Sequence, residues 1–225
     1  MPTDSPSARP SDSPPSRPSD VHSSRPSDPH PARPNDPPYA RPTVDDLAAA
    51  RDREIEDWLR PDLDVLFCGI NPGLYSAAVG LPFANPGTRY WKAMHEAGFT
   101  DRVLRPWERE EFLAAGLGMT NVVRRATARA DELTPDEIVE GGRRLVETAE
   151  AYRPRWVAVL GLGAYRTAFA DRRAAAGPLE RRIGPARAWL LPNPSGLNAH
   201  HTVATLGAAY AELRVAAGLP DRRRT

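Results

Sequence analysis

The sequence predicts an α/β protein: a three-layer α/β/α domain around a central, mainly parallel four-stranded sheet, preceded by a disordered tail. From residue 44 onward, short apolar segments alternate with segments of helical periodicity, which is typical of a parallel sheet covered by helices on both faces. Residues 1–43 contain no Leu, Ile, Phe or Trp and therefore cannot form a core. We expect one domain over residues 44–225 behind a tail at 1–43.

The tail is a degenerate octapeptide repeat. Arg-Pro recurs every eight residues from Arg9 to Arg41, and residues 1–43 hold 13 of the 25 prolines of the chain. Arginine and aspartate balance within the tail, so its composition favours an extended, neutral segment of polyproline II character. We hypothesise that it tethers a partner of unknown identity or maintains weak contacts with DNA.

Four segments have the apolar, β-branched and aromatic composition of buried strands. The first of them, "DVLFCGI", is expected to be central in the sheet. The fourth strand of the sheet is expected at "GMTNVV". The four segments are residues 64–70, 118–123, 155–161 and 187–192.

Six further segments have helical periodicity. They are residues 44–59, 88–99, 106–116, 135–152, 164–176 and 202–217. We expect Thr43 to cap the first helix, and Gly98 and Gly116 to end the second and third. The fourth has the clearest start, because Thr134 and Glu137 match a capping box.

Ligands of such sheets bind beyond the carboxyl ends of the strands. We expect four segments, which lie at or just after the predicted strands and contain glycine, asparagine or proline, to line one rim. They are "GINPG" at 69–73, "GMTNVV" at 118–123, "GLG" at 161–163 and "NPSGLN" at 193–198.

The sequence lacks the motifs of several common kinds of catalytic and binding site. The sequence has no P-loop lysine motif and no Gly-x-Ser-x-Gly elbow, and its histidines lack the spacing of metal ligands. Gly161 and Gly163 match only part of a dinucleotide fingerprint, which leaves a nucleotide-binding Rossmann-like protein as the weaker alternative. The single cysteine, Cys68, lies in an apolar run and argues against an iron–sulfur cluster. We expect no metal and no other cofactor.

Charge and hydropathy limit the expected binding surfaces and the expected location of the protein in the cell. The formal net charge is +1, so any basic surface for DNA has to be local. The start of the chain lacks the pattern of a signal peptide, and no apolar run reaches membrane-spanning length. We expect a cytoplasmic monomer without membrane contacts, associated with the nucleoid when bound to DNA.

Amides and main-chain groups are what the predicted rim offers. An asparagine can orient a water or hold the edge of a base, but it cannot take up a full proton at neutral pH. Such a site suits a leaving group that departs with its own electron pair, aided by positioning and by hydrogen bonds to developing negative charge. Cleavage of the bond between uracil and its sugar is one such reaction, although the residues alone do not single it out.

Longer motifs carry a specific resemblance. "GINPGLYSAAVGLPFANPGTRYWKAMHEAGFT", "GMTNVVRRAT", "EGGRRLVE" and "LPNPSGL" together resemble the mismatch-specific uracil-DNA glycosylase and thymine-DNA glycosylase family, within the uracil-DNA glycosylase superfamily. The resemblance covers about residues 63–213 and implies a uracil-DNA glycosylase-like fold. It further implies a monofunctional glycosylase of base excision repair that acts on double-stranded DNA. Such an enzyme flips uracil, or thymine or a modified pyrimidine, out of a mispair with guanine and hydrolyses the N-glycosidic bond to leave an abasic site.

The resemblance also implies roles for residues after the first two predicted strands. Asn71 would position the attacking water. Gly69, Ile70, Phe83 and Asn121 would bind the base, with Phe83 stacking on it and the main-chain N–H groups of Ile70 and Phe83 reading its edge. Asn121 is asparagine in the thymine-directed branch but lysine in some mismatch-uracil members, so the preferred base stays open.

A third predicted region matches the loop that enters DNA in this family. Leu197 would fill the gap that the flipped nucleotide leaves, and Gly196 would allow the backbone to approach the duplex. Some relatives carry a longer polar or basic pair where this chain has Asn198 and Ala199, so contacts to the orphaned guanine stay open. The loop consists of Asn193, Pro194, Ser195, Gly196, Leu197 and Asn198.

Two interpretations remain open beside the main one, and the first is the nucleotide-binding Rossmann-like protein named above. A non-catalytic binder of damaged or abasic DNA on the same fold would carry the same motifs. Basic side chains near the rim would either hold phosphates or remain solvated surface charges; these are Arg89, Lys92, Arg124 and Arg125.

Overall fold

A five-stranded sheet forms the centre of the protein, in the strand order β2-β1-β3-β5-β4. We analysed a computed structural model, which describes residues 37–196 and 201–224. β1 pairs in parallel with β2 and β3, and β3 pairs in parallel with β5, so the predicted α/β class and the mainly parallel sheet are confirmed. The strands are β1 (Val65–Gly69), β2 (Leu117–Asn121), β3 (Trp156–Leu160), β4 (Gly177–Ile183) and β5 (Ala186–Leu191).

The number of strands was predicted wrongly, because the sheet has a fifth strand. β4 pairs antiparallel with β5 at the edge of the sheet. Among its residues only Ile183 is buried, and Glu180 and Arg182 are exposed. An edge strand of this kind lacks the continuous apolar run by which the other strands were identified. The helix predicted before it is also shorter than expected, ending at Ala168.

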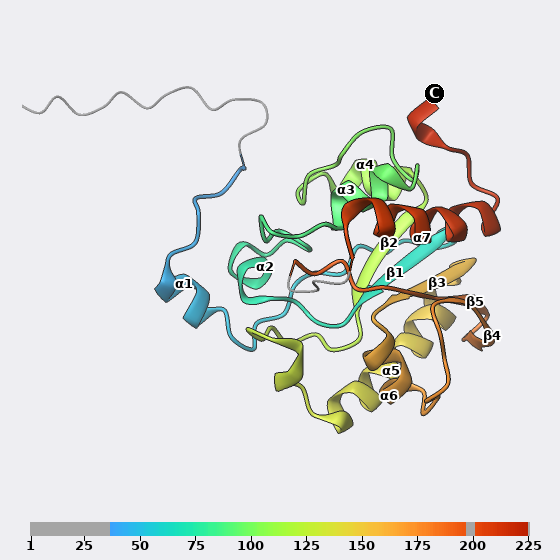
Figure 1. The fold of residues 1–225 in the computed structure, drawn as a ribbon. Helices are drawn as coiled ribbons and strands as arrows, with labels where there is room; N and C mark the ends of the chain where they lie inside the picture. The colour runs from blue at the N-terminus through green and yellow to red at the C-terminus, as the bar shows by residue number, and fades with distance from the viewer. Residues whose placement is uncertain (1–36, 197–200, 225) are drawn as a thin grey trace, which may run out of the picture. The chain divides into compact units, whose positions relative to one another are not determined.

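Helices cover both faces of the sheet (Figure 1). On one face, Phe67 of β1 contacts the rings of Tyr90, Phe112 and Tyr210, which belong to α3, α4 and α7. α5 and α6 pack against each other over the opposite face. The helices are α1 (Val44–Ala49), α2 (Leu74–Val79), α3 (Tyr90–Glu96), α4 (Arg109–Ala114), α5 (Pro135–Tyr152), α6 (Leu162–Ala168) and α7 (Val203–Ala216), with short 3-10 turns η1 (Ala130–Glu132) and η2 (Arg222–Arg224).

The first helix is much shorter than the predicted 44–59. Thr43 caps it as expected, but the helix ends at Ala49 and Asp52 has a φ of 62°. The chain then runs beside β2, where the N–H groups of Trp58 and Met119 each donate to the other's carbonyl at 2.8 and 2.9 Å. Tertiary pairing with the outer edge of β2 therefore overrides the local helical pattern.

The other predicted helix boundaries agree well with the structure. Thr134 and Glu137 form the predicted capping box of α5. Gly98 and Gly116 follow α3 and α4 with φ of 81° and 80°, in the left-handed region that glycine adopts readily. α2, within "GLYSAAVG", was not predicted; it is a helix of six residues.

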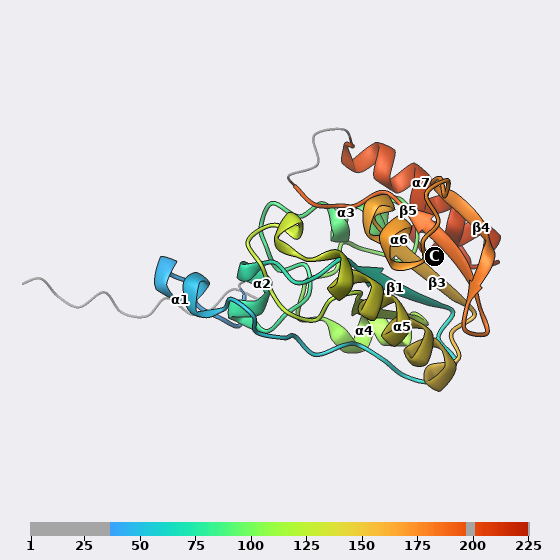
Figure 2. The ribbon, with the colours of Figure 1, turned by 90° about the horizontal axis from the view of Figure 1, so that it is seen from below.

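α1 and α2 lie beyond one end of the sheet, away from β4, in both views (Figures 1 and 2). The tail predicted at 1–43 lies mostly outside the described residues. Its last residues, 37–43, belong to the same unit as the sheet, and Tyr39 places its ring edge-on to Trp107 at 6.0 Å. Among the described helices, none has the length and apolar composition to cross a membrane.

Candidate active site

The chain segments that follow β1 and β2 run side by side beyond the ends of these strands. The N–H of Val122 donates to the carbonyl of Gly69 at 2.9 Å, and the N–H of Thr127 donates to that of Pro72 at 3.2 Å. The parallel pairing of the two strands thus continues into the loops. This pairing places Asn71 against residues from the second loop.

Two hydrogen bonds fix the side-chain amide of Asn71. Its Nδ2 donates to the main-chain oxygen of Arg125 at 3.1 Å and to Oγ1 of Thr127 at 2.7 Å. The hydroxyl of Thr127 donates in turn to the carbonyl of Arg129 at 2.7 Å, so its oxygen is the acceptor toward Asn71. Both donors of the amide are therefore used, which also decides the orientation of the amide.

The oxygen of this amide is the acceptor that remains. Among the described residues, no donor contacts Oδ1 of Asn71, and the side chain is half-buried. Its two partners are a carbonyl and a hydroxyl, neither of which is an acid or a base at neutral pH. The arrangement can orient a polar molecule, but it cannot remove a full proton.

Asn121 and Phe83 meet over Gly69, where no side chain separates them. A Cβ placed on Gly69 would lie 2.5 Å from Oδ1 of Asn121 and 3.6 Å from Cζ of Phe83. The missing Cβ thus leaves room for an amide and the edge of an aromatic ring at one point. These three predicted base-binding residues therefore lie together, at the carboxyl end of β1.

The backbone and the ring of Phe83 are both fixed by neighbouring residues. It has a φ of 47°, which is costly for a residue with a side chain, and its carbonyl accepts a hydrogen bond from Nε1 of Trp91 at 3.2 Å. Its ring stacks on that of the fully buried Tyr90, with centroids 4.1 Å apart and planes inclined by 10°. Tyr90 thus fixes the plane in which Phe83 offers its other face.

Two main-chain donors remain at this point. The N–H groups of Ile70 and Phe83 donate to no acceptor within the described part of the chain. The side chain of Ile70 lies over Gly161, where a Cβ would come within 3.0 Å of Ile70 Cδ1. Gly161 of the "GLG" segment therefore makes room for packing, which explains it without a dinucleotide.

The segment after β5 forms a turn of its own. Oδ1 of Asn193 accepts from the N–H of Ser195 at 3.0 Å, and the carbonyl of Pro194 accepts from the N–H of Arg89 at 3.2 Å. Leu197 and Asn198, which were predicted to enter DNA, lie outside the described residues.

Arg89 joins this turn to the segment that precedes α3. Its guanidinium donates to the carbonyls of Ser195 and Gly196 at 3.2 and 3.3 Å. Gly196 also lies so close to Gly87 that an added Cβ would come within 2.5 Å of the Gly87 carbonyl oxygen. Arg89 was considered as a phosphate contact; in the structure it supports the predicted DNA-entering loop.

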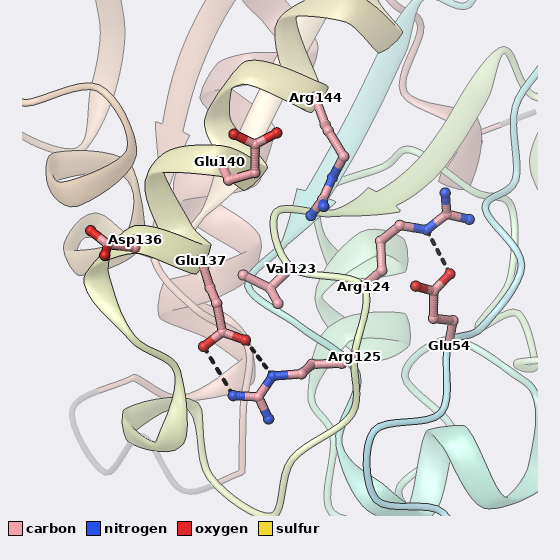
Figure 3. A pocket seen from close by; sticks show the side chains of 8 residues that line it. All are labelled: Glu54, Val123, Arg124, Arg125, Asp136, Glu137, Glu140 and Arg144. Atoms are coloured by element: carbon pink, nitrogen blue, oxygen red, sulfur yellow. Dashed lines mark hydrogen bonds and ion pairs between the residues drawn. The ribbon is translucent and has the colours of Figure 1, made fainter.

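The other basic residues considered for phosphate contacts differ in their partners. Arg125 pairs with Glu137, and Arg124 pairs with Glu54 at 3.1 Å (Figure 3). Arg125 also pairs with Asp52. Lys92 is exposed on α3.

No cluster of His, Cys, Asp and Glu suited to a metal occurs among the residues that the structure describes. Cys68 is fully buried, and burial raises the pKa of its thiol, which agrees with the predicted apolar role. Two side-chain amides, two main-chain donors and one aromatic ring are the groups that the structure brings together at the site.

Sequence reasoning missed two residues of this site. Thr127 was part of the motif "GMTNVVRRAT" but received no role, because its contact with Asn71 arises only when the two loops pair. Tyr90, in the predicted helix 88–99, also received no role, because its contact with the ring of Phe83 depends on the left-handed backbone at Phe83.

A comparison with known families agrees with this geometry. Residues 56–214, well over half of the chain, match the family model described as the uracil DNA glycosylase superfamily. The match includes all three segments that form the site. The chain therefore belongs to the uracil DNA glycosylase superfamily, and its function is of the DNA glycosylase type, with DNA as its partner.

Proposed function

We propose that the protein is a monofunctional DNA glycosylase of base excision repair that flips uracil out of a mispair with guanine and hydrolyses its N-glycosidic bond. Thymine and modified pyrimidines in similar mispairs are further candidate substrates. The observation that carries the proposal is the fixed amide of Asn71 near the cluster of Gly69, Phe83 and Asn121. Superfamily membership supports base release from DNA, and the resemblance to mismatch-specific enzymes supports the U·G mispair.

In the proposed reaction, Oδ1 of Asn71 accepts a hydrogen bond from a water and holds it against the anomeric carbon of the flipped nucleotide. The C1′–N1 bond breaks and its electron pair leaves with the base. The water oxygen bonds to C1′, and the water loses one proton to solvent while the base anion gains one. An amide suffices for this, because the proton leaves after the sugar has become cation-like and the water strongly acidic.

The departing base needs stabilisation of its negative charge. The N–H groups of Ile70 and Phe83 have no acceptor in the described chain, and in this scheme they donate to the base oxygens. The ring of Phe83, backed by Tyr90, provides the stacking face. The amide of Asn121 offers both a donor and an acceptor to the base edge, as discrimination between pyrimidines requires.

Strand cleavage is not part of the proposal. It would need an amine that attacks the sugar, and the only lysine of the chain, Lys92, is exposed on α3.

The loop from Asn193 onward enters the duplex, and Leu197 fills the gap left by the flipped nucleotide.

The test is base release from duplexes that hold one U·G, U·A or T·G pair, and from single-stranded uracil DNA, scored as strand breaks after alkali. We expect release from U·G with the wild-type protein. Asn71→Ala should lower the single-turnover rate by about 100-fold or more while duplex binding changes little. Undiminished release by Asn71→Ala would remove Asn71 from the mechanism. Binding without alkali-labile product in the wild type would instead favour a non-catalytic binder of damaged or abasic DNA.

A further inference from the structure

Arg125 lies directly behind the amide that the proposed function requires. Its main-chain oxygen accepts one of the two hydrogen bonds from Asn71, while its side chain extends away from that amide. Figure 3 shows the guanidinium turned toward the carboxylate of Glu137, at the start of α5. Arg125 thus connects the amide of Asn71 to the start of α5.

Three groups hold the guanidinium of Arg125. The carboxylate of Glu137 accepts from both Nε and Nη2, the second contact at 3.0 Å. Asp52 accepts from Nη1 at 3.0 Å, and the main-chain oxygen of Glu132 accepts from Nη2 at 3.2 Å. A two-pronged contact of this kind fixes direction as well as distance, which a lysine cannot reproduce.

The partners of Arg125 are themselves anchored. Glu137 accepts from the N–H of Thr134 at 2.8 Å in the capping box of α5. Glu132 pairs with Arg51 at 2.5 Å, which ties the end of η1 to the chain after α1. The support of Arg125 therefore reaches two separate elements beyond its own loop.

The same helix holds the start of the loop. Arg144 of α5 donates to the main-chain oxygen of Val122 at 3.0 Å. Contacts from α5 thus fix Val122, just after β2, and Arg125, three residues farther on. The carbonyl that receives Asn71 lies within this fixed stretch.

The charges of the pair are strongly stabilised. Hydrogen bonds from Arg125 and then from the Thr134 main chain lower the pKa of Glu137 to about 2, so this carboxylate is ionised at every pH at which a glycosylase would work. The contact with Glu137 raises the pKa of Arg125 above its already high value. Both side chains are less than one-third exposed, at 29% and 30%, which limits screening by solvent.

We propose that Arg125 is a positioning residue for catalysis: its guanidinium, clamped by Glu137 and Asp52, fixes the carbonyl that orients the amide of Asn71. The inference rests on the proposed role of Asn71 in base release. Arg125 touches no substrate in this scheme, and its effect on the reaction passes entirely through Asn71.

The neighbouring Arg124 is a matched control. It also pairs with a carboxylate, Glu54 at 3.1 Å, but its side chain points away from that of Arg125 (Figure 3). The amide of Asn71 donates to Arg125 and Thr127, and not to Arg124. Arg124→Met and Arg125→Met remove the same charge from adjacent positions. A difference in release rate between the two variants therefore depends on the position of the arginine and not on the net charge of the protein.

The first experiment separates the chemical step from DNA binding. Single-turnover base release from a U·G duplex is measured with saturating protein, and the Kd of the same duplex is measured separately. We expect Arg125→Met to slow release by about 10- to 100-fold, because small misplacement of a catalytic group has effects of this size. Its Kd should match that of Arg124→Met, whose release rate should stay near that of the wild type. Glu137→Gln and Arg125→Lys, which keep most of the packing, should give intermediate rates and carry the test if Arg125→Met does not fold.

The second experiment is a double-mutant cycle with Asn71→Ala. If Arg125 acts through Asn71, then Arg125→Met should cost nothing further once the amide is absent. A general loosening of the pocket would instead lower the residual rate again by a similar factor.

The outcomes separate this inference from the proposed function. Absence of base release by the wild-type protein overturns the proposed function itself. An active wild type with equal rates for Arg124→Met, Arg125→Met and Glu137→Gln overturns the positioning role alone. Full additivity in the double-mutant cycle does the same.

Discussion

The two loops that form the site are held in different ways. The loop after β2 is paired along its length with the loop after β1, and ion pairs to α5 and to the chain after α1 support it from behind. Within the part of the turn after β5 that the structure describes, Arg89 contacts three consecutive residues, 194–196. The first arrangement fixes one side-chain amide from two sides, whereas the second holds main-chain groups at the start of the loop predicted to enter DNA.

This difference assigns separate tasks to the two regions. Chemistry at a sugar carbon depends on placing one oxygen accurately, and a preformed set of hydrogen bonds provides that before substrate arrives. Entry into a duplex requires a segment that adapts to the DNA. Changes in the first region should therefore alter the rate of base release, and changes in the second should alter duplex binding.

The largest effect is expected at Gly69. A methyl group there would meet Oδ1 of Asn121 at 2.5 Å and push the amide out of the pocket. Because the clash is with the end of a side chain, the fold should persist, and base release should fall by about 100-fold or more. The measurement is single-turnover release by Gly69→Ala, with circular dichroism to verify folding.

Gly73→Ala is the control for that change. A Cβ at Gly73 has no atom within 4 Å, although this residue lies in the same loop. Its release rate should stay near that of the wild type. Equal rates for both variants would show that the position of the Asn121 amide over Gly69 does not affect base release.

A smaller loss is expected from Thr127→Val, which keeps the shape but removes the hydroxyl that receives Asn71. The amide would keep its bond to Arg125 and lose one of its two supports. Loss of one such bond is worth about 1 to 1.5 kcal/mol, or roughly a tenfold lower rate. Thr127→Ser retains the hydroxyl and should restore most of the rate. If Thr127→Val matched the wild type, the carbonyl of Arg125 alone would orient the amide.

Local signals in the sequence predicted the elements that local interactions determine. α5 begins where Thr134 and Glu137 form their capping box, and the structure has the helix at the predicted bounds. The predicted helix at 44–59 is wrong because Trp58 pairs with Met119, 61 positions later, and nothing near residue 58 announces that partner. β4 was missed for a related reason, since only its pairing with β5 makes this charged segment a strand.

The same distinction applies to the site. The resemblance named Asn71, and the order of the strands brought its loop next to that of Asn121, as parallel strands require. The orientation of the amide was beyond prediction, because its partners Arg125 and Thr127 lie 54 and 56 residues away in the chain. The residue types thus indicated which chemistry the site can perform, whereas tertiary contacts determine the orientation of the Asn71 amide.

Arg89→Met tests the other side of the comparison. Losing two hydrogen bonds from a partly exposed guanidinium to the carbonyls of Ser195 and Gly196 should weaken duplex binding by about 3- to 10-fold. The rate at saturating protein should change by less than about twofold, since Asn71 keeps both partners. Lys92→Met, which removes an exposed charge from the helix that follows Arg89, should affect binding less. A rate loss as large as that of Thr127→Val would show that the two regions are coupled.

The smallest expected effect is a difference between the two regions in how their contribution to stability depends on pH. The carboxylate of Glu137 can be protonated, whereas the carbonyls that hold Arg89 cannot. The pKa of Glu137 is lowered in the folded protein to about 2 from an ordinary 4.5, so its ionised form stabilises the fold. This contribution is complete above about pH 4.5 and is lost as the pH falls toward 2. The difference in Tm between the wild type and Glu137→Gln should therefore be constant from about pH 8 to 5.5 and shrink below about pH 4.5. The difference between the wild type and Arg89→Met should show no such decline, and a parallel decline in both would mean that acid weakens the fold as a whole and not the support of Arg125.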